Sequence, residues 1–125
     1  LISIGKAADK NMLLPLIKKI AKKRNIVLHA TEHTHMYYKK HGVTTSRVYK
    51  VSEIGKIPNI SDLLQRRVFD VIINIPTRDK VVSAKEFTDG KLIRKGAIDM
   101  GIALVTDTEV ALTLFGNLIA AERRV

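Results

Sequence analysis

The sequence predicts an α/β fold in which a parallel β-sheet is covered by helices on both faces. Short runs rich in Val and Ile alternate with longer stretches that have the periodicity of helices. Two of these runs, Val68–Ile75 and Ile102–Thr106, are joined by a segment of about 25 residues that contains a predicted helix over Gly90–Gly101, as in a parallel strand–helix–strand unit. With 125 residues, 46% of them hydrophobic, the chain is expected to form one domain, 1–125, with a hydrophobic core.

The chain begins with a predicted strand and a long amphipathic helix. Leu1–Ile4 is a short, mostly apolar run. The helix after it extends to about Arg24, and we expect Asp9 or Asn11 to cap its start. Pro15 then falls in or near the first turn, where a missing N–H costs least.

A second and a third strand are predicted on either side of a shorter helix. Ile26–Ala30 is the second strand, and a helix opens near Thr34 and stops at Gly42. Thr45–Val51 alternates polar and apolar residues, which fits a strand at an edge of the sheet.

The remaining elements complete the alternation. Ser61 is expected to cap a short helix before the fourth strand, Val68–Ile75. The fifth strand is Ile102–Thr106, and the last helix begins near Thr108. Since the apolar runs of these two strands are continuous, both are expected to be covered on both faces.

The net charge of +10 favours an anionic partner. However, the basic residues around Lys18–Arg24 lie on one side of an amphipathic helix, which is typical of a solvated face. Aromatic residues make up only 5% of the chain and are scattered, so the sequence lacks the stacking platform of single-strand-binding proteins. A nucleic-acid partner is therefore not expected.

Composition also bears on the compartment. The chain has no cysteine, which excludes disulfides and thiolate metal sites and favours a cytoplasmic protein. Apolar runs such as Met12–Ile17 are far shorter than the ~20 residues of a membrane-spanning helix, so no membrane partner is expected. Because Leu1 is not a Met and opens a strand-like run, we expect a domain of a longer polypeptide.

Polar side chains follow the predicted strands at the points where the strands end. Hydroxyl, amide and ammonium groups of this kind suit an oxyanion such as phosphate or carboxylate. Two threonines lie where the second strand turns into a helix, whose N–H groups and dipole also favour an anion; a plain helix cap is the alternative interpretation. The side chains at these strand ends are Lys10, Thr31, Thr34, Lys50, Asn74 and Thr77.

The sequence contains no recognisable catalytic or metal motif. The four histidines, His29, His33, His35 and His41, span a strand-to-helix change that prevents a common face, and H-E-x-x-H does not occur. They are interpreted as surface or hydrogen-bonded histidines. The segment GKAADKN after the first strand matches no phosphate loop or dinucleotide fingerprint. No catalytic residue, metal or cofactor is expected in this domain.

Five segments in this order resemble those of a known family: LISIGKAADK, LHATEHT, YKVSEIGKIPNISDLL, FDVIINIP and GKLIRKGAIDMGIALVT. Over nearly its whole length the chain resembles the methylglyoxal-synthase-like domain, most closely the one at the C-terminus of the carbamoyl-phosphate synthase large subunit. The resemblance implies a three-layer sandwich with a five-stranded parallel sheet of order 3-2-1-4-5. It also implies an allosteric regulatory domain in pyrimidine or arginine biosynthesis, with synthetase domains on the same polypeptide and a homo-oligomer left open.

The same resemblance implies which residues bind the effector, a nucleotide such as UMP or IMP in some members and N-acetylglutamate in others. In this chain Glu32 and His33 replace small residues of the family, and we expect Glu32 to repel an anion and His33 to crowd or assist it. A lysine at position 50 is similar to nucleotide-regulated members and indicates a phosphorylated effector. The implied effector-binding residues are Ser3, Lys10, Thr31, Thr34, Lys50, Asn74 and Thr77.

Two enzyme families of the same fold are the main alternatives. Methylglyoxal synthases carry GDQQ-like and PHDPD-like segments, where this chain has EIGKIPNIS and TRDKVVSAKEFTDGK. The domain of the purine enzyme that closes the inosinate ring carries KTLHP, which is also absent. Asp79, Asp89 and Asp107 are therefore interpreted as turn and cap residues rather than bases. A free-standing enzyme acting on a phosphorylated small molecule stays the alternative function, and a nucleic-acid- or protein-binding module the third.

Overall fold

Strands and helices alternate along the chain as the sequence predicts. The computed structural model describes residues 1–77 and 84–121, with residues 84–88 described by their backbone alone. The elements are β1 Ile2–Ile4, α1 Ala7–Ala21, β2 His29–Ala30, α2 Glu32–Lys40, β3 Ser46–Arg47, α3 Ile60–Gln65, β4 Val71–Ile75, α4 Ala84–Asp99, β5 Ala103–Val105 and α5 Thr108–Ala121.

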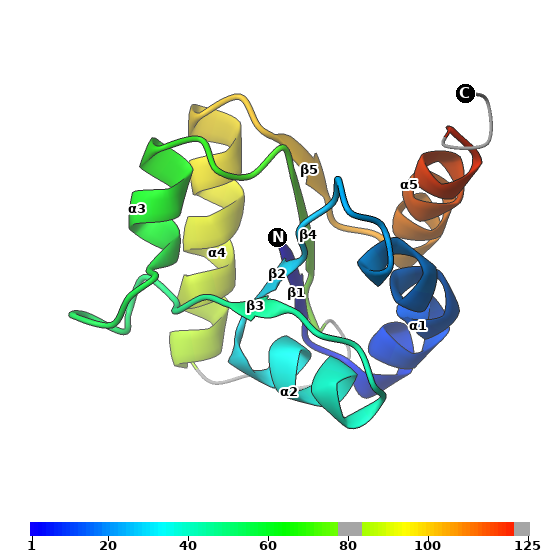
Figure 1. Ribbon diagram of the computed structural model, residues 1–125. Helices are drawn as coiled ribbons and strands as arrows, with labels where there is room; N and C mark the ends of the chain where they lie inside the picture. The colour runs from blue at the N-terminus through cyan, green and yellow to red at the C-terminus, as the bar shows by residue number, and fades with distance from the viewer. Residues whose placement is uncertain (78–83, 122–125) are drawn as a thin grey trace.

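The five strands form one parallel sheet in the order β3-β2-β1-β4-β5 (Figure 1). β1 is central, and its Ile2 lies opposite Ala30 of β2 and Ile73 of β4. β3 lies at an edge, as predicted from its alternating pattern. The predicted fold class and strand order are confirmed. Because the chain continues on one side of β1 with β2 and β3 and on the other with β4 and β5, the order reverses between β1 and β4.

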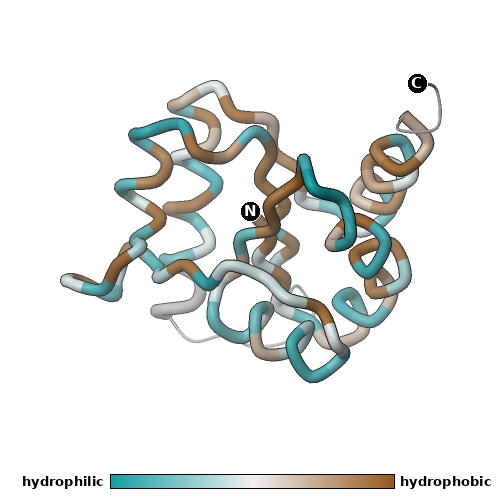
Figure 2. The backbone as a smooth tube through the Cα atoms, viewed as in Figure 1, coloured by the Kyte–Doolittle hydropathy of each residue, from teal (hydrophilic) through white to brown (hydrophobic). Residues whose placement is uncertain are grey.

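Helices cover the sheet on both faces. One core cluster joins α1, α2 and α5 to Ile73 and Ile75 of β4, whereas Ile72 belongs to a second cluster with α3 and α4. Alternate residues of β4 thus point to opposite faces, and both faces are apolar. Figure 2 shows hydrophobic residues gathered in the sheet and alternating with hydrophilic ones along the helices. No helix in the described ranges has the length and hydrophobicity needed to cross a membrane.

The start of α1 differs from its prediction. The helix begins at Ala7, with Lys6 at its N-cap and no side-chain bond to the first turn, so capping by Asp9 or Asn11 is wrong. Pro15 lies inside the helix rather than in its first turn. It removes the hydrogen bond to the carbonyl of Asn11. Since Pro15 and Asn11 are both exposed, water can solvate that carbonyl.

All five strands are shorter than predicted, β1 by one residue and β5 by two. β2 contains only the last two residues of Ile26–Ala30, because in the register Ile2–Ala30 the preceding residues extend beyond Leu1 and have no β1 partner. β3 is continued only by an isolated bridge between Tyr49 and Asn59. β4 begins at Val71.

The helices α3 and α4 begin earlier than predicted. α3 starts at Ile60, and its cap is Asn59, whose side chain accepts a bond from Ser61 N–H; the predicted Ser61 cap is wrong. α4 already includes Ala84, well before the predicted start at Gly90. α5 starts at Thr108 as predicted.

Two glycines provide a test of how α4 and α5 are built. Gly101 follows α4 at a φ of +67°, where an L side chain is strained, whereas Gly116 lies inside α5 with no atom within 4 Å of a Cβ. We expect Gly101→Ala to lower the free energy of unfolding by about 1–2 kcal/mol and Gly116→Ala to raise it by about 0.5–1 kcal/mol. Urea unfolding of both variants measures this. If both substitutions changed the free energy of unfolding in the same direction, the left-handed turn at Gly101 would be contradicted.

Candidate functional site

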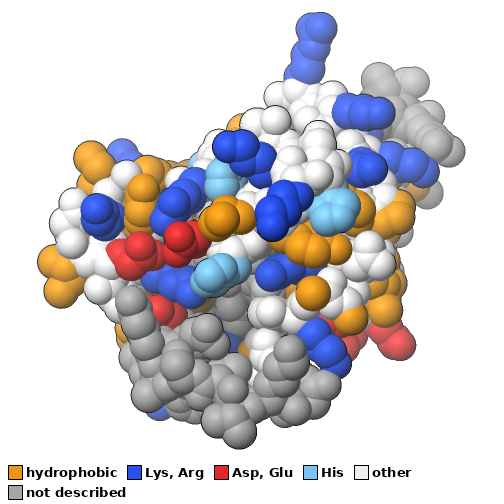
Figure 3. Space-filling model, turned by 90° about the horizontal axis from the view of Figure 1, so that it is seen from below, with side chains coloured by type: hydrophobic (Ala, Val, Ile, Leu, Met, Phe, Trp, Pro, Cys, Tyr) orange, Lys and Arg blue, Asp and Glu red, His pale blue; other side chains and the backbone are white. Residues whose placement is uncertain are grey.

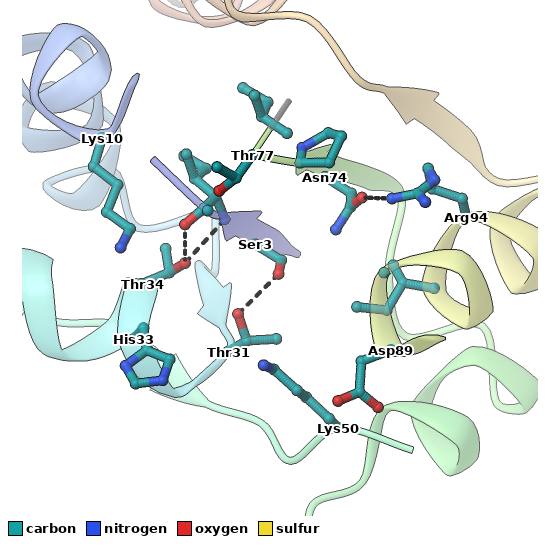
Figure 4. Close-up of a pocket in the computed structure, with 16 residues that line it drawn as sticks. Ser3, Lys10, Thr31, His33, Thr34, Lys50, Asn74, Thr77, Asp89 and Arg94 are labelled. Carbon is teal, nitrogen blue, oxygen red and sulfur yellow. Dashed lines mark hydrogen bonds between the residues drawn. The ribbon is translucent and has the colours of Figure 1, made fainter. Parts of the chain in front are cut away.

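A pocket of about 570 Å³ opens at the carboxyl edge of the sheet. It lies where the chain order reverses between β1 and β4, the usual position of ligand sites in open parallel sheets, and its volume is typical of small-molecule sites. The structure brings all the effector-binding residues implied by the resemblance to this one pocket (Figure 4). They are Ser3, Lys10, Thr31, Thr34, Lys50, Asn74 and Thr77.

The N-terminus of α2 forms one wall of the pocket. Thr31 occupies the N-cap position, but its side chain makes no bond to the helix; its hydroxyl bonds instead to Ser3 Oγ at 2.9 Å. The first N–H groups of a helix have no partner within the helix. An anion at this wall therefore meets backbone donors and the positive end of the helix dipole.

Thr34 has a structural role in this wall. Its Oγ1 accepts a bond from Ile4 N–H at 3.0 Å and donates one to Ile4 O at 3.4 Å. The side chain is buried, and these bonds tie the first turn of α2 to the end of β1. The interpretation of Thr31 and Thr34 side chains as helix caps is wrong, because both hydroxyls bond to β1 instead.

Lys10 brings a buried cation to the pocket from α1. Only 7% of its surface is exposed, and its Nζ lies 5.6 Å from the ring centre of Tyr37. Tyr38 Oη donates a bond to the Lys10 carbonyl. Burial lowers the pKa of Lys10 below its ordinary value, because its charged form loses hydration. A bound anion would reverse this effect.

Glu32 and His33, the two residues that depart from the family pattern, differ in their position relative to the pocket. Glu32 pairs with Arg47 at 3.5 Å and is not part of the pocket lining. The expectation that its carboxylate would repel a bound anion is therefore not supported at this site. His33 does line the pocket, on the same side as Lys10 in Figure 4.

The pocket has a second polar wall, formed by α4, which sequence reasoning missed. Arg94 lines it and donates a bond from Nη1 to Asn74 Oδ1 at 2.6 Å. Asn74 is 4% exposed. The missed signal is the i, i+4 spacing of Gly90 and Arg94, which places both on one face of the helix.

Asp89 is the acidic residue that lines the pocket among the described residues. The prediction of a turn or cap residue is wrong here: Asp89 lies inside α4 and is 2% exposed. Its Oδ2 accepts a bond from Ser52 Oγ at 3.0 Å, while its Oδ1 is buried without a hydrogen-bond partner in the described part of the chain. A buried oxygen of this kind is costly unless a ligand or water donates to it. Asp107 is a cap as predicted, since it accepts a bond from Val110 N–H at the start of α5; Asp79 lies outside the described residues.

The histidines are dispersed. His29 packs edge-on against Phe69, His35 bonds to Thr45, and His41 stacks on Tyr37. Within residues 1–77 and 84–121, no three potential ligands lie close enough together to bind a metal ion.

Basic side chains dominate the end of the molecule that contains α2. Seen from below in Figure 3, Lys, Arg and His side chains are spread over this surface, and acidic side chains are fewer. Such a surface attracts anionic small molecules towards the pocket.

Comparison with known proteins gives a consistent picture. Residues 12–106 match the model of the MGS-like domain family. The carbamoyl phosphate synthase large chain of Agathobacter rectalis is 32% identical over 114 residues, which cover 91% of this chain and 10% of that protein. The corresponding protein of Methanosarcina barkeri is 34% identical over 105 residues, covering 84% of this chain and 9% of its own length.

Another relative is itself named as a section of the enzyme. The C-terminal section of the carbamoyl phosphate synthase large chain of Aquifex aeolicus is 32% identical over 98 residues, covering 78% of this chain and 17% of the relative. This chain thus spans about a tenth of the length of the full-length relatives above. Five of the seven implied effector-binding residues lie within the family match, and Ser3 and Lys10 precede it.

The role of Thr34 can be tested by unfolding. We expect Thr34→Val to lower the free energy of unfolding by about 1–3 kcal/mol, because Ile4 N–H is left buried without an acceptor. Ser3→Ala, in the same wall but partly exposed, is the control and should cost less than about 1 kcal/mol. Urea titration of both variants measures the difference. A Thr34→Val variant as stable as Ser3→Ala would show that the bond to β1 does not hold α2 in place.

Proposed function

Because the chain belongs to the MGS-like domain family, we propose that it is the effector-binding regulatory domain of a carbamoyl phosphate synthase large chain. Similarity to several such large chains over most of the chain supports this proposal. The synthetase domains would then lie on the same polypeptide, outside these residues. The effector would be a nucleotide monophosphate or a similar anionic metabolite of pyrimidine or arginine biosynthesis.

The observation that supports an anionic ligand most strongly is that donors from several elements line the same pocket. The first turn of α2 offers backbone N–H groups, and Lys10 and Lys50 line the pocket from α1 and from the segment after β3. Charge-assisted bonds of this kind contribute roughly 1.5–3 kcal/mol each. A phosphate or carboxylate group suits these donors.

The pocket also suits a ligand with groups that donate hydrogen bonds. The unpartnered Oδ1 of Asp89 needs a donor, and a hydroxyl group of a sugar supplies one. Asn74 and Thr77 add an amide and a hydroxyl to the lining. A ligand with an anionic group and several hydroxyl groups, such as UMP or IMP, matches both the cations and Asp89. N-acetylglutamate also has anionic groups, but its amide N–H is its one donor for Asp89 when its carboxyl groups are ionised.

The proposed site can be tested with three lysine variants. Lys10→Met and Lys50→Met remove a cation from the pocket, so each should weaken UMP or IMP binding about 10- to 100-fold in calorimetry. Lys22→Met is the matched control: Lys22 follows α1 and is exposed, so binding should change only slightly and in a salt-dependent way.

The outcome separates a pocket from a basic surface. If Lys22→Met weakens binding as much as Lys10→Met, the affinity comes from diffuse charge and the proposed pocket is wrong. If N-acetylglutamate binds and both nucleotides do not, the domain is regulated by a carboxylated effector.

One observation favours an enzyme of the same fold as a second candidate. Asp89 is a buried carboxylate beside a pocket suited to a phosphorylated small molecule, which is a position that a general base can occupy. In such an enzyme it would abstract a proton from a carbon next to a carbonyl. Its Oδ2 already accepts a bond from Ser52, and this engagement favours a binding role.

We expect the purified chain to form no methylglyoxal from dihydroxyacetone phosphate above the uncatalysed background. The physical reason is that the GDQQ- and PHDPD-like segments of methylglyoxal synthases are missing from this sequence. A colorimetric assay of methylglyoxal measures this. Turnover that disappears in Asp89→Asn would establish the enzyme instead.

A further inference from the structure

We propose that Arg94 is a positioning residue that selects ligands through Asn74, and that Gly90 is required for Arg94 to do so. In this arrangement the pocket offers the Asn74 amide N–H groups to the ligand and therefore prefers a hydrogen-bond acceptor at that point. The inference rests on the proposed function, because it assigns a selectivity to the same pocket.

The orientation of the Asn74 amide follows from its partner. Arg94 Nη1 lies 2.6 Å from Asn74, and a guanidinium group has donors only. The Asn74 atom that faces it must therefore be Oδ1, which assigns the amide without ambiguity. The group left for a ligand is Nδ2, and Figure 4 shows it turned towards the middle of the pocket.

Without this bond the amide of an asparagine can turn over. Oxygen and nitrogen then exchange places, and the same side chain accepts as readily as it donates. The bond to Arg94 removes the second state. A ligand that places a donor against Nδ2 leaves two donors facing each other, which is the situation a polar pocket rejects most strongly.

Gly90 supplies the space in which Arg94 reaches Asn74. Arg94 lies one turn after Gly90 on α4, and helical side chains lean back towards the N-terminus. A Cβ on Gly90 would lie 2.9 Å from Arg94 Nη1 and 3.7 Å from Cζ. Glycine is unfavourable inside a helix, yet here any side chain would displace the guanidinium group from its place beside Asn74.

These contacts predict opposite effects of one substitution. In Gly90→Ala the only close atoms belong to the end of a flexible side chain, so the fold accommodates the methyl group and the helix gains from it. The thermal midpoint should rise by about 2–5 °C. The bond between Arg94 and Asn74 should be lost at the same time.

The test compares UMP with CMP, and IMP with AMP. In each pair a carbonyl oxygen of the base is exchanged for an amino group, so an acceptor becomes a donor at nearly constant shape. For the unmodified chain we expect UMP to bind at least tenfold more tightly than CMP by calorimetry. In Arg94→Ala and Gly90→Ala this ratio should fall at least fivefold. The loss of charge in Arg94→Ala weakens both nucleotides, so the ratio and not the affinity is the measurement.

Gly116→Ala is the matched control, because it adds a methyl group to a helix away from the pocket. It should raise the thermal midpoint and leave the UMP to CMP ratio unchanged. In the double variant Gly90→Ala/Arg94→Ala, the ratio of UMP to CMP affinity should equal that of Arg94→Ala alone, because Gly90 acts through Arg94.

A measurement without ligand separates this inference from the proposed function. The side-chain amide signals of Asn74 in a ¹⁵N-edited NMR spectrum should shift in Gly90→Ala and Arg94→Ala but not in Gly116→Ala. If no nucleotide binds to the unmodified chain, the proposed function fails and the NMR shifts still decide whether Arg94 holds Asn74. The inference is overturned if the Asn74 signals stay in place in Gly90→Ala, or if the unmodified chain binds CMP as tightly as UMP.

Discussion

All five strands run in the same direction, and this constraint determines where the chemistry of the molecule lies. Parallel strands end at one edge of a sheet, so the polar residues that follow them meet there although they are far apart in sequence. Between β1 and β4 the chain order reverses, which leaves a crevice at this edge of the sheet. The pocket occupies this crevice, with β1 and β2 on one side and β4 and α4 on the other.

The polar groups around the pocket divide into two kinds. Some are bonded to the protein itself: Thr34 to the backbone of Ile4, Thr31 to Ser3, and Asn74 to Arg94. These bonds hold α2 and α4 at defined positions beside the sheet. Among the described residues, the groups left for a ligand are the first-turn amides of α2, the lysine ammonium groups, Nδ2 of Asn74 and one oxygen of Asp89. A site whose own side chains are already bonded in this way loses little freedom when a ligand binds.

Much of the fold and of one wall of the pocket could be predicted from sequence. The Val- and Ile-rich runs indicated the strands, and the polar residues at their ends, such as Thr31 and Asn74, indicated the edge where the pocket opens. The wall formed by α4 could not be predicted, because the helix was expected to begin only at Gly90 and Asp89 was assigned to a turn. The hydrogen-bond partner of the Thr34 hydroxyl could not be predicted from sequence either. A hydroxyl in a sequence does not reveal that it will bond to a backbone group 30 residues away.

The charges at the pocket are consistent with a doubly charged ligand. Among the described residues, Lys10, Lys50 and Arg94 line it together with one carboxylate, Asp89, so in this part of the chain the cations exceed the carboxylate by two. A phosphate monoester has a charge of about −1.5 to −2 near pH 7, which matches that excess. The other basic residues of the chain lie mainly on exposed helix faces, where salt screens them beyond about 10 Å. Their effect is therefore on the rate of encounter rather than on the choice of ligand. Within the pocket, Lys10 is the cation whose charge burial disfavours, since burial lowers its pKa.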